Sequence, residues 1–164
     1  MRDRFTRDPA QAALYEALCG KTASERISEN NQGEQNVSME NRKTAPVGVF
    51  DSGVGGLTVA REISRQLPNE NIVYFGDTAR VPYGSKSQNT IIRFSEQIIR
   101  FLKTKDVKAI VIACNTASAL ALDAVRDEFD IPVMGVVIPG ARAAVEATKN
   151  RKVGGGGTDA TVQS

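Results

Sequence analysis

The sequence predicts an α/β fold, a doubly wound parallel sheet, preceded by a poorly ordered N-terminal extension. Two observations lead to this prediction. From Pro46 onward, short runs of β-forming residues alternate with longer amphipathic stretches, which is the pattern of βαβ units. Residues 1–45 lack this alternation and are polar for most of their length, which is typical of segments that cannot bury a core.

The N-terminal extension contains one predicted helix. Asp8, Pro9 and Gln11 have the types and spacing of an N-cap acid, a first-turn proline and a capping-box glutamine. Gly20 is suited to end that helix. Residues 21–44 are rich in Ser, Asn, Gln and Glu, so we expect a linker or a disordered tail there.

Four strands and four helices are expected to alternate after the extension. The expected strands are 47–50, 71–75, 107–113 and 131–137, and the expected helices are 57–67, 87–103, 117–129 and 139–149, the last with proline at its start. The clearest apolar face at helical spacing belongs to the helix 87–103 and consists of Ile91, Ile92, Ser95, Ile98, Ile99 and Leu102. A fifth strand is due after Val153, but the glycines 154–157 that follow weaken a strand interior.

Composition excludes several classes of protein. At 164 residues, 41% hydrophobic and 24% charged, the chain has the size and composition of one globular domain. Its net charge of +2 is too mild to indicate a nucleic-acid partner. No apolar run is long enough to span a membrane, and two distant cysteines, at 19 and 114, do not suggest a disulfide framework. We therefore expect a cytoplasmic protein that binds neither nucleic acid nor membrane.

The loop after the first predicted strand is dense in glycine, with the sequence Asp51-Ser52-Gly53-Val54-Gly55-Gly56. Backbone N–H groups in such a turn can approach an anionic ligand at a helix N-terminus. The loop is not a Walker A motif, because no lysine follows the glycines, nor a dinucleotide fingerprint, because the sixth position from Gly53 is Thr58. A tight turn capped by Asp51 or Ser52 is the alternative, and these residues alone leave it open.

The loop 76–85 after the second predicted strand lies at the same sheet edge, because parallel strands present their carboxyl ends together. Gly84 can offer a backbone N–H group and Tyr83 a hydroxyl. Alternatively, Asp77 and Arg80 pair with each other at the surface, a contact usually worth under about 1 kcal/mol.

Cys114 follows the third predicted strand and stands beside a helix N-terminus. Partial positive charge and unpaired N–H groups at such a place favour a thiolate, and open α/β sheets bind their ligands at this edge. A redox C-x-x-C motif is excluded by Ala117, and the absence of histidine excludes a Cys–His hydrolase and ordinary zinc binding. Two interpretations are left: a buried inert cysteine, or a thiolate that moves a proton or attacks a carbon. In the second, Asn115 and Thr116 are suited to hold a carboxylate beside the sulfur.

Three segments together, in this order, resemble the amino-terminal domain of glutamate racemases. They are Asp51-Ser52-Gly53-Val54-Gly55-Gly56-Leu57, Asp77 with Pro82-Tyr83-Gly84, and Ala113-Cys114-Asn115-Thr116-Ala117-Ser118. The resemblance runs from about Pro46 to Lys152. It implies one domain of the two-domain racemase fold and a cofactor-independent interconversion of L- and D-glutamate that supplies D-glutamate for peptidoglycan.

The resemblance also implies roles for individual residues. Cys114 matches the amino-terminal one of two cysteines that move the α-proton, and Asp51 matches the acid that assists it. The residues that would hold the substrate are Asp51, Ser52, Tyr83, Gly84, Asn115 and Thr116. No cofactor, pyridoxal phosphate included, and no metal is implied. The partner is the small-molecule substrate glutamate, and a homodimer is left open.

The chain also departs from the racemase pattern. The second cysteine, which the family carries in a Cys-Thr-His context, is missing, and Gly155 and Gly156 stand where aliphatic residues are usual. We therefore expect an amino-terminal racemase domain over 46–151, the start of a truncated second domain over 152–164, and half an active site. The alternatives are a non-catalytic fragment that binds substrate or docks on an intact racemase, and an unrelated phosphate-binding α/β domain.

Overall fold

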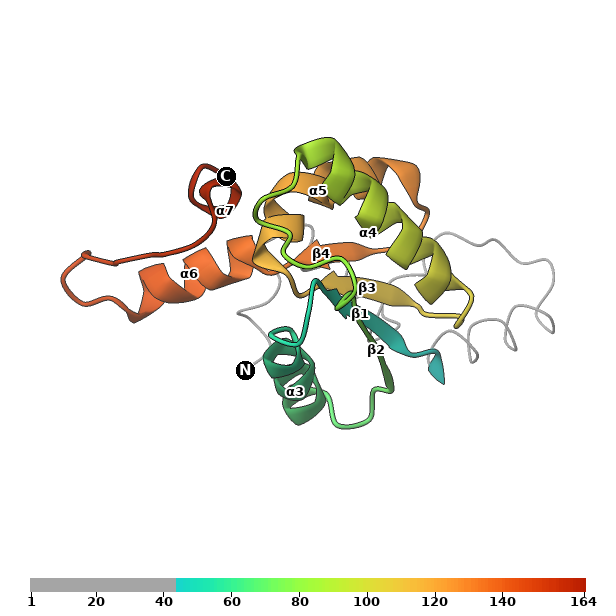
Figure 1. The fold of residues 1–164 in the computed structure, drawn as a ribbon. Coiled ribbons are helices and arrows are strands. Elements are labelled where there is room, and N and C mark those ends of the chain that lie inside the picture. The colour runs from blue at the N-terminus through green and yellow to red at the C-terminus, as the bar shows by residue number, and fades with distance from the viewer. Residues whose placement is uncertain (1–43) are drawn as a thin grey trace, which may run out of the picture.

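The computed structural model describes residues 44–164, which form one parallel sheet with flanking helices (Figure 1). The strands are β1 (Val47–Asp51), β2 (Ile72–Gly76), β3 (Ala109–Ile112) and β4 (Val133–Gly135), in the order β2-β1-β3-β4. The helices are α3 (Leu57–Gln66), α4 (Gln88–Lys103), α5 (Asn115–Glu128), α6 (Val137–Ala147) and α7 (Asp159–Val162). The predicted α/β class is confirmed. The helix and linker expected in residues 1–43 lie outside the described residues.

The sheet is covered on both faces. Side chains alternate along each strand, so Phe50 and Ile110 pack into a core with α4 and α5, while Val49 and Val111 pack on the other face against α3. Figure 1 shows α4 and α5 on one side of the sheet and α3 on the other. Continuous burial explains why β3 is an unbroken apolar run and why β1 carries no polar side chain before Asp51, as expected of central strands in a parallel sheet.

Helix α4 follows the predicted apolar face closely. Ser87 is its N-cap and accepts a hydrogen bond from the Thr90 backbone N–H at 3.3 Å. Of the predicted core-facing residues, Ile92 is half-buried and the other five are buried, namely Ile91, Ser95, Ile98, Ile99 and Leu102. Among residues 44–164, the Ser95 hydroxyl is a buried side-chain group without a hydrogen-bond partner.

Two predicted boundaries near the carboxyl end of the sheet are wrong. The strand expected over 131–137 is only Val133–Gly135, and the helix expected to start at Pro139 begins at Val137. Pro139 is instead the third residue of α6, where a missing N–H costs nothing because first-turn N–H groups have no intrahelical acceptor. The chain therefore leaves the sheet earlier than its apolar residues suggested.

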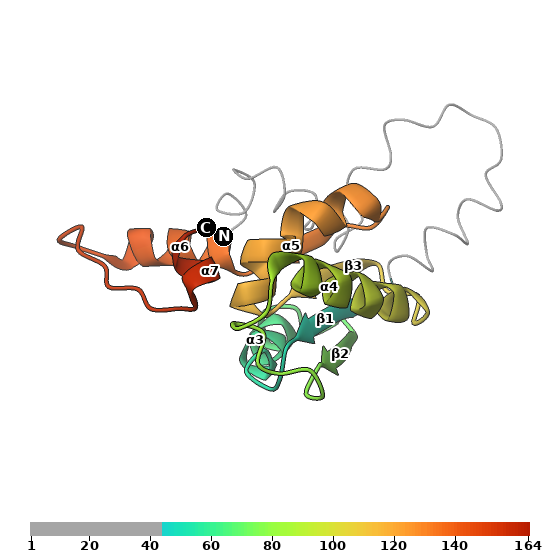
Figure 2. The ribbon, with the colours of Figure 1, turned by 45° about the horizontal axis from the view of Figure 1, so that its top comes forward.

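The segment after α6 forms no strand, in keeping with the weakening effect of the glycines 154–157. In Figures 1 and 2, α6 extends away from the sheet and the chain then returns to α7. The Thr158 hydroxyl lies 3.1 Å from the Thr116 hydroxyl at the start of α5. Among residues 44–164, no helix is both long and apolar enough to cross a membrane.

Candidate active site

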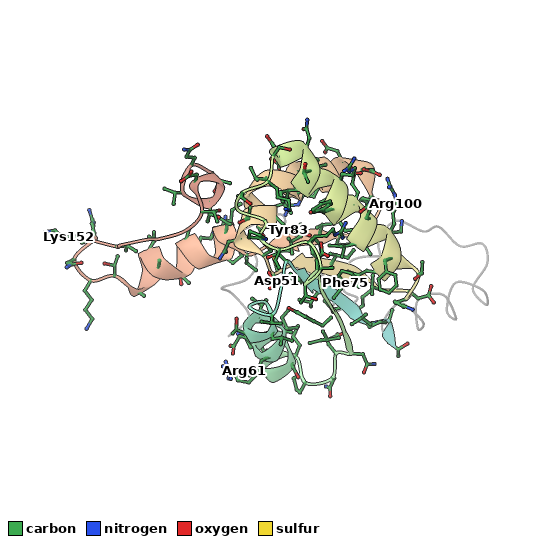
Figure 3. The ribbon with its side chains drawn as sticks, in the orientation of Figure 1. Asp51, Arg61, Phe75, Tyr83, Arg100 and Lys152 are labelled. Atoms are coloured by element: carbon green, nitrogen blue, oxygen red, sulfur yellow. The ribbon has the colours of Figure 1, made fainter. Side chains whose placement is uncertain are left out.

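The loops that follow β1, β2 and β3 meet at one edge of the sheet. The Asp77 backbone N–H donates to the Asp51 carbonyl at 2.9 Å, and the Ala113 N–H donates to the Phe50 carbonyl at 2.7 Å. Figure 3 places Asp51 and Tyr83 at this edge, and Arg61, Arg100 and Lys152 away from it. The predicted convergence of the three loops is thus observed.

Cys114 is the N-cap of α5, which begins two residues earlier than predicted, at Asn115. Its sulfur accepts a hydrogen bond from the Ala117 backbone N–H at 3.5 Å, and its thiol donates to the Ser52 Oγ at 3.4 Å. Only 6% of the residue is exposed. The sulfur therefore lies at the positive end of a helix and touches the loop that follows β1.

The Asp51 carboxylate holds the glycine loop together. Its Oδ2 accepts from the backbone N–H groups of Gly53 at 3.2 Å and Gly56 at 2.9 Å, and its Oδ1 accepts from the Ser52 hydroxyl at 3.4 Å. A Cβ at Gly56 would lie 2.6 Å from the Asp51 Cβ and 2.8 Å from the Ala113 Cβ, so this position accepts only glycine. The capped turn is therefore present, and the same residues also place Ser52 beside the thiol.

A second buried carboxylate, Asp77, organises the loop after β2. It accepts from the Tyr83 hydroxyl, and the Arg80 Nε lies 2.9 Å from its Oδ1 and 2.7 Å from its Oδ2. Arg80 in turn donates to Gln97 at 2.6 Å and lies over the Phe94 ring. The alternative Asp77–Arg80 pair therefore forms, but not at the surface, because the Asp77 side chain is only 5% exposed.

Tyr83 uses its hydroxyl within the protein. Burial raises the pKa of this hydroxyl, and the hydrogen bond to Asp77 raises it further. The group therefore stays protonated and is committed to Asp77. Because its proton is directed at Asp77, the hydroxyl could meet a ligand only as an acceptor, so a ligand contact of Tyr83 stays a prediction, alongside contacts from the backbone of Tyr83 and Gly84.

The first turn of α5 carries the remaining predicted residues. Asn115 is exposed, whereas Thr116 is buried with its hydroxyl directed at Thr158. Thr158 also closes over Gly84, where an added Cβ would lie 2.7 Å from the Thr158 Cγ2. Thr158 was not predicted as part of the site, because no local sequence pattern indicates that the chain returns to the sheet edge after the glycines 154–157.

Within residues 44–164, the thiol coincides with neither a metal-ligand cluster nor the hollow beside α6. Among residues 44–164, no three His, Cys, Asp or Glu side chains are grouped to hold a metal ion. A hollow of about 620 Å³ lies between α5, β4 and α6, lined by residues that include Met134, Ile138 and Arg142. Cys114 does not line it. We place the candidate site at the thiol, because the loops after β1, β2 and β3 converge there.

The domain is a parallel α/β sheet whose strand ends carry a helix-capping thiol and a carboxylate held by glycine N–H groups. Domains of this class bind small ligands at this edge of the sheet. Residues 47–164 match the family model described as Asp/Glu/Hydantoin racemase. The chain belongs to this racemase family, which removes the unrelated phosphate-binding domain from consideration.

Individual relatives agree with the family model. The glutamate racemase of Lactococcus lactis subsp. lactis (strain IL1403) is 56% identical over 126 residues, 77% of this chain and 45% of the relative. That of Nostoc sp. (strain PCC 7120 / SAG 25.82 / UTEX 2576) is 54% identical over 127 residues, 77% of this chain and 43% of the relative. The chain thus spans less than half the length of these curated relatives.

Solved structures give the same result. A glutamate racemase isoform from Bacillus anthracis aligns with a TM-score of 0.69 at 52% identity, covering 73% of this chain and 45% of that one. The Francisella tularensis glutamate racemase in complex with D-glutamate aligns with a TM-score of 0.64 at 48% identity, covering 73% and 45%. The fold that surrounds Cys114 is therefore that of the aligned part of these racemases.

Proposed function

We propose that this chain supplies one side of a glutamate racemase active site, which interconverts L- and D-glutamate by cysteine proton transfer without a cofactor. Family membership and relatives at more than half identity support the reaction class. The single observation that carries the proposal is Cys114, a buried thiol that caps α5 and contacts Ser52 at the edge where three loops converge.

Inversion at an α-carbon requires a base on one face and an acid on the other. In the proposed step, the Cys114 thiolate takes the α-proton, and the electron pair of the broken C–H bond delocalises into the substrate carboxylate. A second group then returns a proton to the opposite face of the carbon. Cysteine suits this work because thiols titrate close enough to neutral pH to both accept and donate a proton.

Asp51 and Ser52 assist the thiol as a short hydrogen-bonded series. The Cys114 thiol donates to the Ser52 hydroxyl, and that hydroxyl donates to the Asp51 carboxylate. Asp51 therefore acts on the sulfur through Ser52, while backbone N–H groups hold the carboxylate in place. The Ala117 N–H supports the thiolate from the helix side.

The substrate would lie against the residues that surround the thiol. Its carboxylates can accept from the first turn of α5, at Asn115 and Thr116, and from the backbone at Tyr83 and Gly84. Ser52 is half-buried beside the sulfur and can turn its hydroxyl to a ligand. The Francisella tularensis relative is solved with D-glutamate bound, which supports an amino-acid ligand of this kind here.

The wider role follows from the reaction. D-glutamate made in the cytoplasm would enter peptidoglycan, so the protein would serve cell-wall formation and cell shape. The second proton-transfer group of the family is a cysteine of a second domain, and Cys114 is the free cysteine of the described residues. We therefore propose that these 164 residues hold half an active site, with a homodimer as one way of associating.

Racemisation by the purified 164-residue chain tests this proposal. We expect little or no conversion of L- to D-glutamate, because one face lacks its acid. Exchange of the α-proton with solvent deuterium needs only one thiol, so any exchange should disappear in Cys114→Ala. Full racemisation would contradict the half-site, and exchange that persists in Cys114→Ala would exclude Cys114 as the base.

The alternative function is a fragment that binds substrate or docks on an intact racemase. Gel filtration of the chain, alone and mixed with the Lactococcus lactis racemase, tests docking, and a glutamate-dependent thermal shift tests binding. A thermal shift without α-proton exchange would favour the binding fragment over the catalytic half-site. If the chain shows no co-elution and no thermal shift, both roles of this alternative are excluded.

A further inference from the structure

We propose that Tyr74 is a positioning residue for the Cys114 thiol, acting through Gly53 and Ser52. The proposal deepens the proposed function and rests on it, since the position of Cys114 matters to catalysis only if its sulfur moves the proton. Tyr74 lies on β2, outside every segment that the racemase resemblance singled out, and neither Asp51 nor Cys114 is among its hydrogen-bond partners.

The Tyr74 side chain reaches from β2 to the glycine loop. It is half-buried against the sheet face that packs on α3, and its hydroxyl donates to the Gly53 carbonyl at 3.1 Å. Burial, and after it the negative charge of Asp51, raises the pKa of this hydroxyl. The hydroxyl is therefore a proton donor at all working pH values.

Gly53 is held at both of its polar backbone atoms. Its N–H donates to the Asp51 carboxylate at 3.2 Å, and its carbonyl accepts from Tyr74. The carbonyl also rests against β2, because a Cβ at Gly76 would lie only 2.4 Å from it. Loss of the tyrosine hydroxyl leaves this carbonyl without its bond and frees the loop on the side facing β2.

Ser52 precedes Gly53 and carries the effect to the sulfur. Its Oγ lies 3.4 Å from the Asp51 Oδ1 and 3.4 Å from the Cys114 Sγ. The Ser52–Asp51 distance is already beyond the usual range for an O–H···O hydrogen bond, so a further displacement of a few tenths of an ångström breaks that contact. The location of Gly53 therefore decides whether Ser52 bridges the carboxylate and the thiol.

The reactivity of Cys114 measures this effect without requiring turnover. In a Cys19→Ala background, which leaves one cysteine, the rate of alkylation by iodoacetamide is compared between the parent and Tyr74→Phe at pH 7 and pH 10. We expect the variant to react slower at pH 7 by about threefold, the size of one net hydrogen bond. At pH 10, where free thiols are ionised, we expect equal rates.

The charged and titratable groups in the two loops that precede the thiol in sequence are unchanged in Tyr74→Phe. They are Asp51 in the loop after β1 and Asp77, Arg80 and Tyr83 in the loop after β2. Ile72→Val is the matched control, because Ile72 lies on the same strand and packs on the same face without a hydroxyl. It should leave both alkylation rates unchanged.

A double-mutant cycle tests the route through Ser52. Ser52→Ala should slow alkylation at pH 7 by itself, and Tyr74→Phe should then add nothing. A second variant, Gly76→Ala, pushes the same Gly53 carbonyl from β2 and should also slow alkylation at pH 7 only, so the proposal stays testable if Tyr74→Phe does not fold.

Three results would overturn the proposal. The first is that Tyr74→Phe slows alkylation of Cys114 as much in the Ser52→Ala background as in the parent. The second is that Ile72→Val slows alkylation as much as Tyr74→Phe does. The third is that Tyr74→Phe raises the alkylation rate at both pH values, which would indicate looser packing alone. Failure of the proposed function has a different signature. In that case α-proton exchange would persist in Cys114→Ala, while the alkylation pattern of the Tyr74 and Ser52 variants would be intact.

Discussion

The sheet edge around Cys114 and the segment 137–164 are organised in opposite ways. At the edge, two carboxylates, Asp51 and Asp77, are buried and surrounded by donors from their own loops. Helix α6 buries none of its residues, and Ile138 and Val145 on it are half or more exposed. Polar groups thus fix the edge in one geometry, whereas the apolar side chains of α6 have little to pack on. Local stability should differ accordingly.

The largest difference between the two regions should appear in matched isoleucine substitutions. Ile110 on β3 is fully buried, and Ile138 on α6 is half exposed. Ile110→Ala should lower the free energy of unfolding by about 2–5 kcal/mol, because it leaves a cavity. Ile138→Ala should change it by less than about 0.5 kcal/mol. Urea denaturation followed by circular dichroism gives both values, and similar losses would show that α6 packs as tightly as the sheet.

Two ion pairs of the same spacing give a second test. Asp77–Arg80 is buried on the acidic side, whereas Glu62–Arg65 on α3 is exposed on both sides. Asp77→Asn should cost about 1–3 kcal/mol of stability, because Arg80 and Tyr83 lose a charged acceptor in a buried place. The matched Glu62→Gln should cost much less, because exposed pairs contribute little. Equal costs in thermal denaturation would mean that burial of Asp77 is not what makes its loop rigid.

Alkaline pH should weaken the edge through Tyr83. Burial and Asp77 raise the pKa of this hydroxyl in the folded protein, while an unfolded tyrosine titrates near pH 10. The folded state therefore retains a proton that the unfolded state releases, so this stabilisation is complete below about pH 10 and falls by up to about 1.4 kcal/mol per pH unit above it. Tyr83→Phe should flatten this part of the stability profile, measured by urea denaturation between pH 8 and 11. If stability falls as steeply with pH in Tyr83→Phe, groups other than Tyr83 cause the loss.

The smallest effect is expected where segment 137–164 returns to the edge. The Thr116–Thr158 hydrogen bond joins two hydroxyls at 3.1 Å. Thr158→Val keeps the shape of the side chain and removes this bond together with the contact of the same hydroxyl to Thr161, so it should weaken the attachment of the segment by about 1 kcal/mol. Within residues 44–164, trypsin should cut first at the exposed Arg151 and Lys152, and Thr158→Val should accelerate that cut. An unaltered rate would show that the hydrogen bond does not anchor the segment.

The order of the elements was predictable, because apolar periodicity is a local property of the sequence. The convergence of their loops was predictable as well, because parallel strands all end at the same edge of the sheet. The start of α5 was not, because cysteine is not among the preferred N-cap residue types, yet the Cys114 sulfur accepts a hydrogen bond from the Ala117 N–H. Val137 was likewise assigned to a strand by its β-branched side chain, although it begins α6.

Competition between partners limited the prediction of the site. Tyr83 carries a hydroxyl that could serve a ligand or a neighbour, and only the packing of its loop shows that Asp77 takes it. The contact between Thr158 and Gly84 joins residues far apart along the chain, and no periodic pattern encodes it. Residue types therefore indicated which groups are present at the edge, while three-dimensional packing decided which of them are already engaged.

The Cys114 sulfur caps the N-terminus of α5, and the same atom is proposed to exchange a proton with the substrate. A charged thiolate is a stronger hydrogen-bond acceptor than a thiol, so the Ala117 N–H is held more tightly before Cys114 takes up a proton than after it. The first turn of α5 carries Asn115 and Thr116. Each proton transfer would therefore tighten or relax the same turn that is proposed to grip the substrate, which links the chemical state of the sulfur to the fit of its ligand.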